Sequence, residues 1–418
     1  MSPELPLPPA GNNESLRRNN LSVVLECIRQ NGPISRADIT RLTGLNFTTV
    51  TSIIESLRES GLVADVGYGD SSGGRRPLLL HLNPHGRFAV GCEIQATLVR
   101  VGLVNLLGET IAVRSWALTA GDEPDEVVKQ IAAAIKELQT ERNLQYSQLA
   151  GIGVAAPGPL DTRSGTFGNP PNLPRWRGYR LKEQLEAASG LQVVLEKDGN
   201  AGALGETWYG NAQTGNTVLF IIADVGIGAG LILHRRLHRG LLDGAGEFGH
   251  MVIDIDGPEC SCGNHGCLEA IASGFALSRE AGHELRRGVH SKLTELDWSD
   301  PDQLVAALPG LGHSDGLAAQ LLSHCGRHVG IALANMINVL SPDTIVIGGR
   351  LGQSNHVADE LERLARERSF LGAASELKVV NTAFPDASLV TGAASLVLAQ
   401  ILQAPVELGD ERNGLHAG

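Results

Sequence analysis

The chain is poor in cysteine, has no long apolar run and does not open with a secretory signal. Only six of its 418 residues are cysteine, and Cys27, Cys92 and Cys325 are scattered without the spacing of a disulfide framework. The longest apolar stretch, residues 389–402, contains polar residues and is too short to span a bilayer, so we expect a buried C-terminal helix. These absences exclude disulfide-rich secreted and membrane proteins, and they predict a cytoplasmic protein with no membrane partner.

Basic residues are outnumbered by acidic ones. The chain has 34 Lys and Arg against 46 Asp and Glu, which gives a formal net charge of −12. An acidic body repels the phosphate backbone of nucleic acids, so any DNA binding must come from placed contacts on a small part of the chain. The length predicts two or three folded units. Residues 1–15 are Pro-rich and polar, which predicts a disordered tail, and residues 405–418 are expected to form a flexible C-terminal tail.

Residues 16–83 predict a winged helix-turn-helix DNA-binding domain. Residues 19–31 carry apolar side chains at helical spacing, and a short helix is expected to begin after Ser35. Asn46 can cap a third helix, which would hold the recognition position. Residues 61–83 resemble two short strands around a Gly/Ser-rich tip, as in a wing. A three-helix bundle could serve another purpose, but two arginines at the wing tip favour DNA.

The candidate DNA contacts are short polar side chains on the third helix and the two wing-tip arginines; they are Asn46, Thr48, Thr49, Ser52, Arg75 and Arg76. Segment 16–83 has eight Arg and six Asp or Glu, so its charge is +2. We expect Arg75 and Arg76 to supply much of the affinity, by entering a narrow A·T-rich minor groove. The alternative for this pair is an exposed, solvated turn.

A metal-binding pattern lies at residues 250–267. His250 precedes Cys260, Cys262 and Cys267, which form Cys-x-Cys-x4-Cys. One neutral imidazole and three thiolates make a closed tetrahedral zinc set, which holds loops rather than activating water. The alternative is a glycine-rich loop with chance thiols. The clustering of a rare residue favours one structural zinc per chain.

From residue 84 to 404, strands alternate with helices and the loops are glycine-rich, which predicts an α/β body. Two glycine-rich hairpins, near residues 93–98 and 224–230, lie about 130 residues apart. This repetition predicts a fold duplicated into two lobes around a cleft.

From about residue 20 to 403 the chain resembles the ROK family of repressors, open reading frames and sugar kinases. The specific motifs are Gly-Glu-Phe-Gly-His at 246–250 and the cysteine run that ends in Cys-Leu-Glu at 267–269. The winged helix places the resemblance in the repressor branch, which includes the xylose and N-acetylglucosamine repressors. The resemblance implies a two-lobed actin-like, ribonuclease H-like sugar-kinase body.

In the family's kinases the first hairpin reads Asp-x-Gly-Gly-Thr-Lys and cradles the ATP phosphates. Here residues 93–98 read Glu-Ile-Gln-Ala-Thr-Leu, so side chains fill space that glycines leave open and the lysine is lost. We therefore expect no kinase activity, because phosphoryl transfer depends on positioning and charge neutralisation. The glycines at 226–230 and 348–349 are interpreted as scaffold that needs positive φ angles.

The resemblance implies a better preserved sugar side. Asp198 matches the family's catalytic base, here vestigial, and can also be a helix N-cap. Glu247, His250 and Glu269 match residues at the sugar, with the zinc holding the two glutamates. Lys197 replaces an asparagine. It either pairs with a neighbouring acid or binds an acidic group of the ligand, such as a sugar acid or phosphosugar.

These observations predict a sugar-responsive repressor of carbohydrate-utilisation genes that its sugar releases from DNA. The alternative is an ATP-dependent sugar kinase that carries a DNA-binding domain, which the altered hairpin at 93–98 disfavours. The expected partners are operator DNA, as an A·T-rich inverted repeat, a sugar or sugar derivative, and further copies of the chain in a dimer or dimer of dimers.

Overall fold

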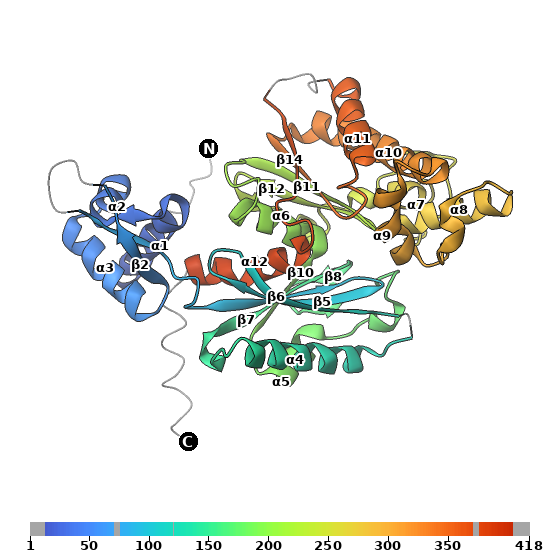
Figure 1. Ribbon diagram of the computed structural model, residues 1–418. Helices are drawn as coiled ribbons and strands as arrows, with labels where there is room; N and C mark the ends of the chain where they lie inside the picture. The colour runs from blue at the N-terminus through green and yellow to red at the C-terminus, as the bar shows by residue number, and fades with distance from the viewer. Residues whose placement is uncertain (1–12, 71–75, 120, 371–375, 404–418) are drawn as a thin grey trace, which may run out of the picture. The chain divides into compact units, whose positions relative to one another are not determined.

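The computed structural model describes residues 13–70, 76–119, 121–370 and 376–403. They divide into two compact units (Figure 1). The first contains residues up to Phe88 with short segments at 105–107 and from Val397 onward, and the second contains residues 89–104 and 108–396. Among the described residues, no helix combines the length and the apolar composition that crossing a bilayer would require.

The first unit is a three-helix bundle with a small sheet. Its helices are α1 (Asn13–Asn31), α2 (Arg36–Thr43) and α3 (Phe47–Glu59). The sheet has the order β1-β3-β2, with strands β1 (Ile34–Ser35), β3 (Leu78–Leu82) and β2 (Val63–Tyr68). The predicted apolar stripes are buried, namely Leu21, Val24, Leu25 and Ile28 on α1 and Val50, Ile53, Ile54 and Leu57 on α3. The winged helix-turn-helix fold is therefore confirmed.

Two details of this unit differ from expectation. The helix α1 begins at Asn13, so residues 13–15 are helical rather than part of a disordered tail. Polar residues tolerate the first turn of a helix that a buried stripe stabilises further along. Leu42, which its spacing from buried Ile39 predicts to be internal, is 53% exposed. The helix α2 is only eight residues long, and a single turn around Ile39 suffices to anchor it.

The second unit contains two five-stranded sheets with the same strand order. The first has the order β10-β7-β4-β5-β6 and consists of β4 (Phe88–Ile94), β5 (Leu98–Asn105), β6 (Thr110–Ala117), β7 (Leu149–Ala156) and β10 (Val193–Lys197). The second has the order β13-β12-β11-β14-β15 and consists of β11 (Thr217–Ala223), β12 (Ile227–Leu233), β13 (Arg236–Leu237), β14 (Thr344–Gly348) and β15 (Lys378–Asn381). In both, the first strand in the chain is central, the second and third follow on one side, and the fourth and fifth on the other. The predicted duplication is confirmed.

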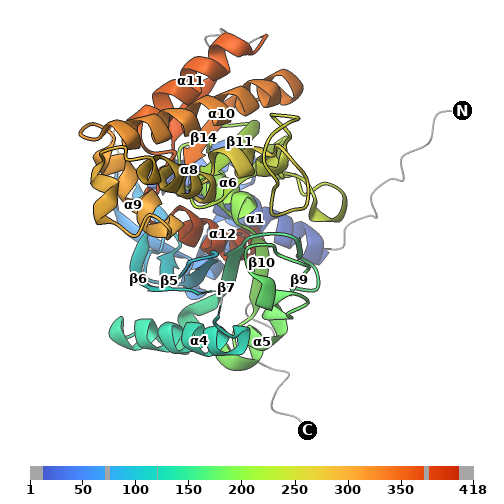
Figure 2. The ribbon, with the colours of Figure 1, turned by 90° about the vertical axis from the view of Figure 1, so that its right-hand side faces the viewer.

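Helices cover these sheets and define two lobes. The first lobe is the β4–β10 sheet with α4 (Pro124–Glu141) and α5 (Leu181–Ser189), which lie along one of its faces (Figure 1). The second lobe is the β11–β15 sheet with α7 (Leu268–Ala272), α8 (Gly274–Arg286), α9 (Pro301–Leu311), α10 (Gly316–Leu340) and α11 (Asn355–Arg368). The helices α6 (Asp198–Trp208) and α12 (Ser388–Gln403) lie between the two sheets (Figures 1 and 2).

The strand β11 shows why this layering forms. Successive side chains of a strand point to opposite faces, and here both faces are apolar. Leu219 and Ile221 join the core that α10 and α11 cover, whereas Phe220 and Ile222 join the core formed with α6 and α12. A strand with two apolar faces must be buried between helical layers.

Close packing, rather than positive φ, explains most of the glycine turn at 226–230. Gly349 has a positive φ angle, whereas Gly226, Gly228 and Gly230 do not. The prediction that these glycines are needed for positive φ angles therefore holds for Gly349 and is wrong for the other three. A Cβ on Gly230 would lie 2.0 Å from the carbonyl oxygen of Gly199. Glycine is therefore needed there because the start of α6 packs directly against β12.

Candidate functional site

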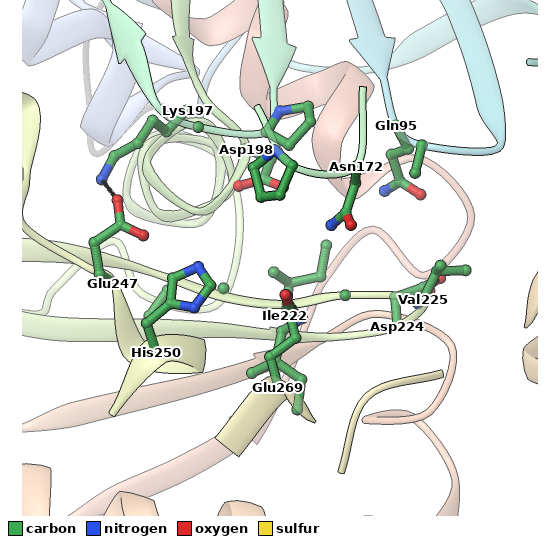
Figure 3. A pocket seen from close by; sticks show the side chains of 18 of the residues that line it. Gln95, Asn172, Lys197, Asp198, Ile222, Asp224, Val225, Glu247, His250 and Glu269 are labelled. Carbon is green, nitrogen blue, oxygen red and sulfur yellow. Dashed lines mark hydrogen bonds and ion pairs between the residues drawn. The ribbon is translucent and has the colours of Figure 1, made fainter. Parts of the chain in front are cut away.

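A cleft of about 870 Å³, including its open mouth, lies between the two lobes. From the first lobe and the start of α6 it is lined by Gln95, Asn172, Lys197 and Asp198, and from the second lobe by Asp224, Glu247, His250 and Glu269. In Figure 3 these two groups face each other across the cleft. All five residues predicted from the resemblance at the sugar side therefore line a single cavity.

Lys197 and Glu247 form an ion pair across this cleft. Lys197 Nζ donates to Glu247 Oε1 at 2.9 Å and to the carbonyl oxygen of Ala245. The Lys197 side chain is 7% exposed, whereas that of Glu247 is 47% exposed. Neither alternative left by the sequence anticipated this partner, because neighbouring Glu196 instead pairs with Arg239 at 2.8 Å.

Asp198 occupies the first position of α6, directly after β10 ends. It is not the helix cap, since Lys197 holds that position without a capping side chain. Asp198 Oδ1 accepts a hydrogen bond from the Gly199 N–H at 2.7 Å. Burial raises the pKa of Asp198 to about 6, while the Gly199 N–H and the Lys197 ammonium oppose the rise. A carboxyl group with this pKa can hold or release a proton near neutral pH.

Glu269 and His250 form the opposite wall. Glu269 Oε2 accepts a hydrogen bond from the Ile227 N–H at 3.1 Å, which ties the start of α7 to β12. Burial raises the pKa of Glu269 above its ordinary value. His250 is half-buried, and its Nδ1 lies 3.6 Å from Cys260 Sγ.

The four predicted metal ligands come together. One ligand atom from each of His250, Cys260, Cys262 and Cys267 lies within 4.8 Å of the other three. The Cys262 and Cys267 sulfurs are 3.8 Å apart. Bond lengths of about 2.3 Å to sulfur and 2.0 Å to nitrogen give tetrahedral edges of roughly 3.8 Å between sulfurs and 3.5 Å between nitrogen and sulfur. The 3.6 Å between His250 Nδ1 and Cys260 Sγ and the 3.8 Å between Cys262 and Cys267 fit a zinc ion, and the set could bind a metal.

An ion network links Asp224, a lining residue of the cleft, to the first hairpin. Arg350 Nη2 lies 2.5 Å from Asp224 Oδ1 and 2.8 Å from Asp302 Oδ1, and the Arg350 N–H donates to Asp224 Oδ2 at 2.8 Å. Thr97, at the hairpin tip of the first lobe, donates to Asp302 Oδ1 at 3.2 Å. Two carboxylates of the protein itself thus neutralise the charge of the Arg350 guanidinium.

The hairpin at 93–98 has no glycine cradle. Glu93 is 1% exposed and pairs with Arg100 at 3.2 Å. Burial raises the pKa of Glu93, although Arg100 opposes this. The turn closes on itself, because the Gln95 N–H donates to the Leu98 carbonyl oxygen at 2.8 Å.

The candidate DNA-binding residues lie on the first unit. Asn46 caps α3, with its Oδ1 accepting from the Thr49 N–H at 2.8 Å. Asn46, Thr48 and Ser52 are exposed and Thr49 is half-buried. Arg76 is exposed, whereas Arg75 lies outside the described residues.

Two charged residues of α3, Glu55 and Arg58, form ion pairs within the unit. Glu55 binds Arg36 at 2.8 Å and Arg58 at 3.3 Å, and Arg58 also pairs with Asp65. Phe47, at the start of α3, is 57% exposed. The sequence did not single it out as a candidate contact residue, although it lies in the predicted recognition helix.

Several lining or supporting residues could not be identified from the sequence. Asn172 lies in a proline-rich loop, and the network of Asp224, Arg350 and Asp302 joins positions up to 126 residues apart. The usable signal was the polar residue beside each glycine turn, since Asp224 precedes Gly226 and Arg350 follows Gly349. Their mutual pairing depends on the packing of the second lobe.

Comparison with known proteins agrees with this arrangement. A family model described as the ROK family matches residues 89–400, and one described as winged helix-turn-helix DNA-binding matches residues 21–64. A putative xylose repressor of Caldicellulosiruptor sp. (strain Rt8B.4) is 31% identical over 396 residues, which cover 94% of this chain and 99% of that protein.

Two solved structures of the ROK family resemble this chain. A ROK family transcriptional regulator, a homologue of the E. coli MLC protein, superposes with a TM-score of 0.75 at 26% identity and covers 93% of this chain and 97% of its own. A ROK family glucokinase from Streptomyces griseus, in complex with glucose and AMPPNP, has a TM-score of 0.65 at 27% identity and covers 74% of this chain and 98% of its own. The chain therefore belongs to the ROK family.

Proposed function

We propose that this protein is a sugar-responsive transcription regulator that represses carbohydrate-utilisation genes and leaves its operator when a sugar binds between the lobes. The observation that carries the proposal is the joining, in one chain, of a winged helix to a cleft lined by Asp198, Glu247 and Glu269. Ionised carboxylates accept hydrogen bonds from sugar hydroxyls without any group transfer. The relatives named as repressors support this function.

Phosphoryl transfer is not part of the proposed function. In the kinases of the family the first hairpin holds the ATP phosphates, but here Gln95 and Ala96 line the corresponding end of the cleft. Asp224, which also lines the cleft, is paired with Arg350, and Arg350 also pairs with Asp302. Asp198 then serves as a hydrogen-bond acceptor for the ligand.

We also propose that His250, Cys260, Cys262 and Cys267 hold one zinc ion. The ion would fix the loop between Glu247 and Glu269, because His250 lies three residues after the first glutamate and Cys267 two residues before the second. Zinc in a closed four-ligand site supplies no activated water. Its role here is to keep both carboxylates in place.

On the DNA side, α3 is proposed to enter the major groove and the wing residues Arg75 and Arg76 to contact an A·T-rich minor groove. A dimer, or a dimer of dimers, would place two winged helices on an inverted repeat. Asn46 shapes the start of α3 through its cap, so Thr48, Thr49 and Ser52 are the main candidates for contacts from this helix.

The experiment that tests the function selects DNA from a random pool with the full-length protein and then titrates the selected site with sugars. The expected result is an inverted-repeat site that is released by a sugar. A protein that shows ATP turnover dependent on a sugar, lost in Asp198→Asn, would instead be a kinase. Failure to enrich any sequence would overturn the regulator function.

A further inference from the structure

The charged side chains around the cleft are mostly acidic. Among the described lining residues, four carboxyl groups, those of Asp198, Asp224, Glu247 and Glu269, accompany the ammonium of Lys197. Asp224 is neutralised by Arg350, which binds it at 2.5 Å. Three carboxyl groups therefore remain against one cation. A ligand that enters this cleft meets hydrogen-bond acceptors and negative charge.

Lys197 has little of its charge left for a ligand. Its Nζ already donates to Glu247 Oε1 and to the Ala245 carbonyl oxygen, and its side chain is 7% exposed. Two of its three N–H donors are therefore in use, and the Glu247 carboxylate already compensates its positive charge. An anion that approached Lys197 would also meet the negative charge of Glu247. These contacts argue against the hypothesis that Lys197 binds an acidic group of the ligand.

Glu247 itself stays accessible. Its side chain is 47% exposed, and it lines the cleft opposite Asp198. Lys197 holds one oxygen of this carboxylate, so the carboxylate has a fixed direction before the ligand arrives. Lys197 is thus a positioning residue, and the ligand contact is made by the glutamate.

The chemistry of these groups selects a class of ligand. An ionised carboxylate accepts hydrogen bonds and donates none, so its complement is a group that carries donors and no negative charge. Hydroxyls on a neutral sugar ring donate to carboxylates in charge-assisted bonds. A carboxylate or phosphate on the sugar would lose donors and add like-charge repulsion at short range.

We propose that the effector is an uncharged sugar, and that Lys197 secures this specificity by fixing Glu247. This inference rests on the proposed function and narrows it, since sugar acids and phosphosugars are excluded. Asn172 and Gln95, two neutral amides on the first-lobe side of the cleft, can serve the ring oxygen and the remaining hydroxyls.

The test measures binding to the full-length protein by titration calorimetry at pH 7.5. Neutral pentoses, hexoses and N-acetylhexosamines are screened together with their uronic acids and phosphates. The neutral form is expected to bind at least tenfold more tightly than its charged derivatives, with a gap that narrows at high salt. A charged derivative that binds equally or more tightly overturns this inference but leaves a sugar-responsive regulator. Binding by none of these compounds overturns both.

A pair of variants tests the role of Lys197. Lys197→Met should weaken the best neutral sugar at least tenfold, and Lys197→Arg should recover part of the loss. The matched control is Arg239→Gln, which also breaks a pair between the lobes, the one with Glu196, but does not line the cleft. The control should change affinity less than threefold. Equal effects of Lys197→Met and Arg239→Gln on sugar affinity would show that Lys197 acts on stability alone, and would overturn its positioning role.

Discussion

Arg350 donates hydrogen bonds from both Nε and Nη2 to the Asp224 carboxylate, and its backbone N–H donates to the same carboxylate. The pair joins the turn after β14 to the turn after β11, where Asp224 lines the cleft. It forms a link inside the second lobe.

Arg350→Ala is expected to destabilise the protein by roughly 3 kcal/mol, because it leaves the buried Asp224 carboxylate without its partner. Urea unfolding measures the change. Arg363→Ala removes a surface arginine paired with Glu360 and Glu367 and serves as the control, with an expected loss of less than about 1 kcal/mol. Equal losses in the two variants would contradict a structural role for Arg350.

Zinc is expected at about one ion per chain in protein purified without added metal, because three thiolates and one imidazole complete a tetrahedral site. Elemental analysis gives the stoichiometry. Cys260→Ala with Cys262→Ala should lose the ion, whereas Cys325→Ala, a buried cysteine in the core of the second lobe, should keep it. If the double variant kept its zinc, Cys260 and Cys262 would not be metal ligands.

The stability of the protein should fall with rising pH in a window set by Asp198. Its pKa rises from 3.8 to about 6 on folding, so the folded state holds this proton more tightly than the unfolded state does. The free energy of unfolding therefore declines between pH 4 and pH 6, by at most about 3 kcal/mol from this group.

Comparison with Asp198→Asn isolates this contribution, because all other groups cancel in the difference between variant and wild type. The variant should gain stability relative to wild type as the pH rises from 4 to 7. Unfolding curves at a series of pH values test this. A difference that does not change with pH would mean that Asp198 titrates normally in the folded protein.

Arg75→Ala with Arg76→Ala should weaken operator binding and make it less sensitive to salt. Loss of two phosphate or groove contacts lowers the slope of log affinity against log salt by roughly 2. Fluorescence anisotropy at several salt concentrations provides the measurement, with Arg363→Ala as the control for lost positive charge. If the double variant bound the operator with wild-type affinity and salt dependence, Arg75 and Arg76 would not contact the DNA.

Local patterns predicted much of the first unit, since the apolar stripes on α1 and α3 depend on side-chain periodicity. Contacts between distant segments were not predictable. The partner of Lys197 is 50 residues away rather than adjacent, and only the closing of the two lobes brings Glu247 to it. Gly230 was recognised as structural for the wrong reason, because a sequence does not show which backbones come close.

The most direct test of the central claim is operator binding titrated with the best sugar, for wild type and Glu247→Gln. The sugar should release wild-type protein from DNA, because a ligand shifts the equilibrium only through its different affinity for the two states. In Glu247→Gln, release should need at least tenfold more sugar, since one charge-assisted hydrogen bond is weakened. The control Glu126→Gln, on the surface of α4, should match wild type. Release of wild type and Glu247→Gln at the same sugar concentration would place the effector site elsewhere, and no response of wild type to any sugar would contradict a sugar-responsive regulator.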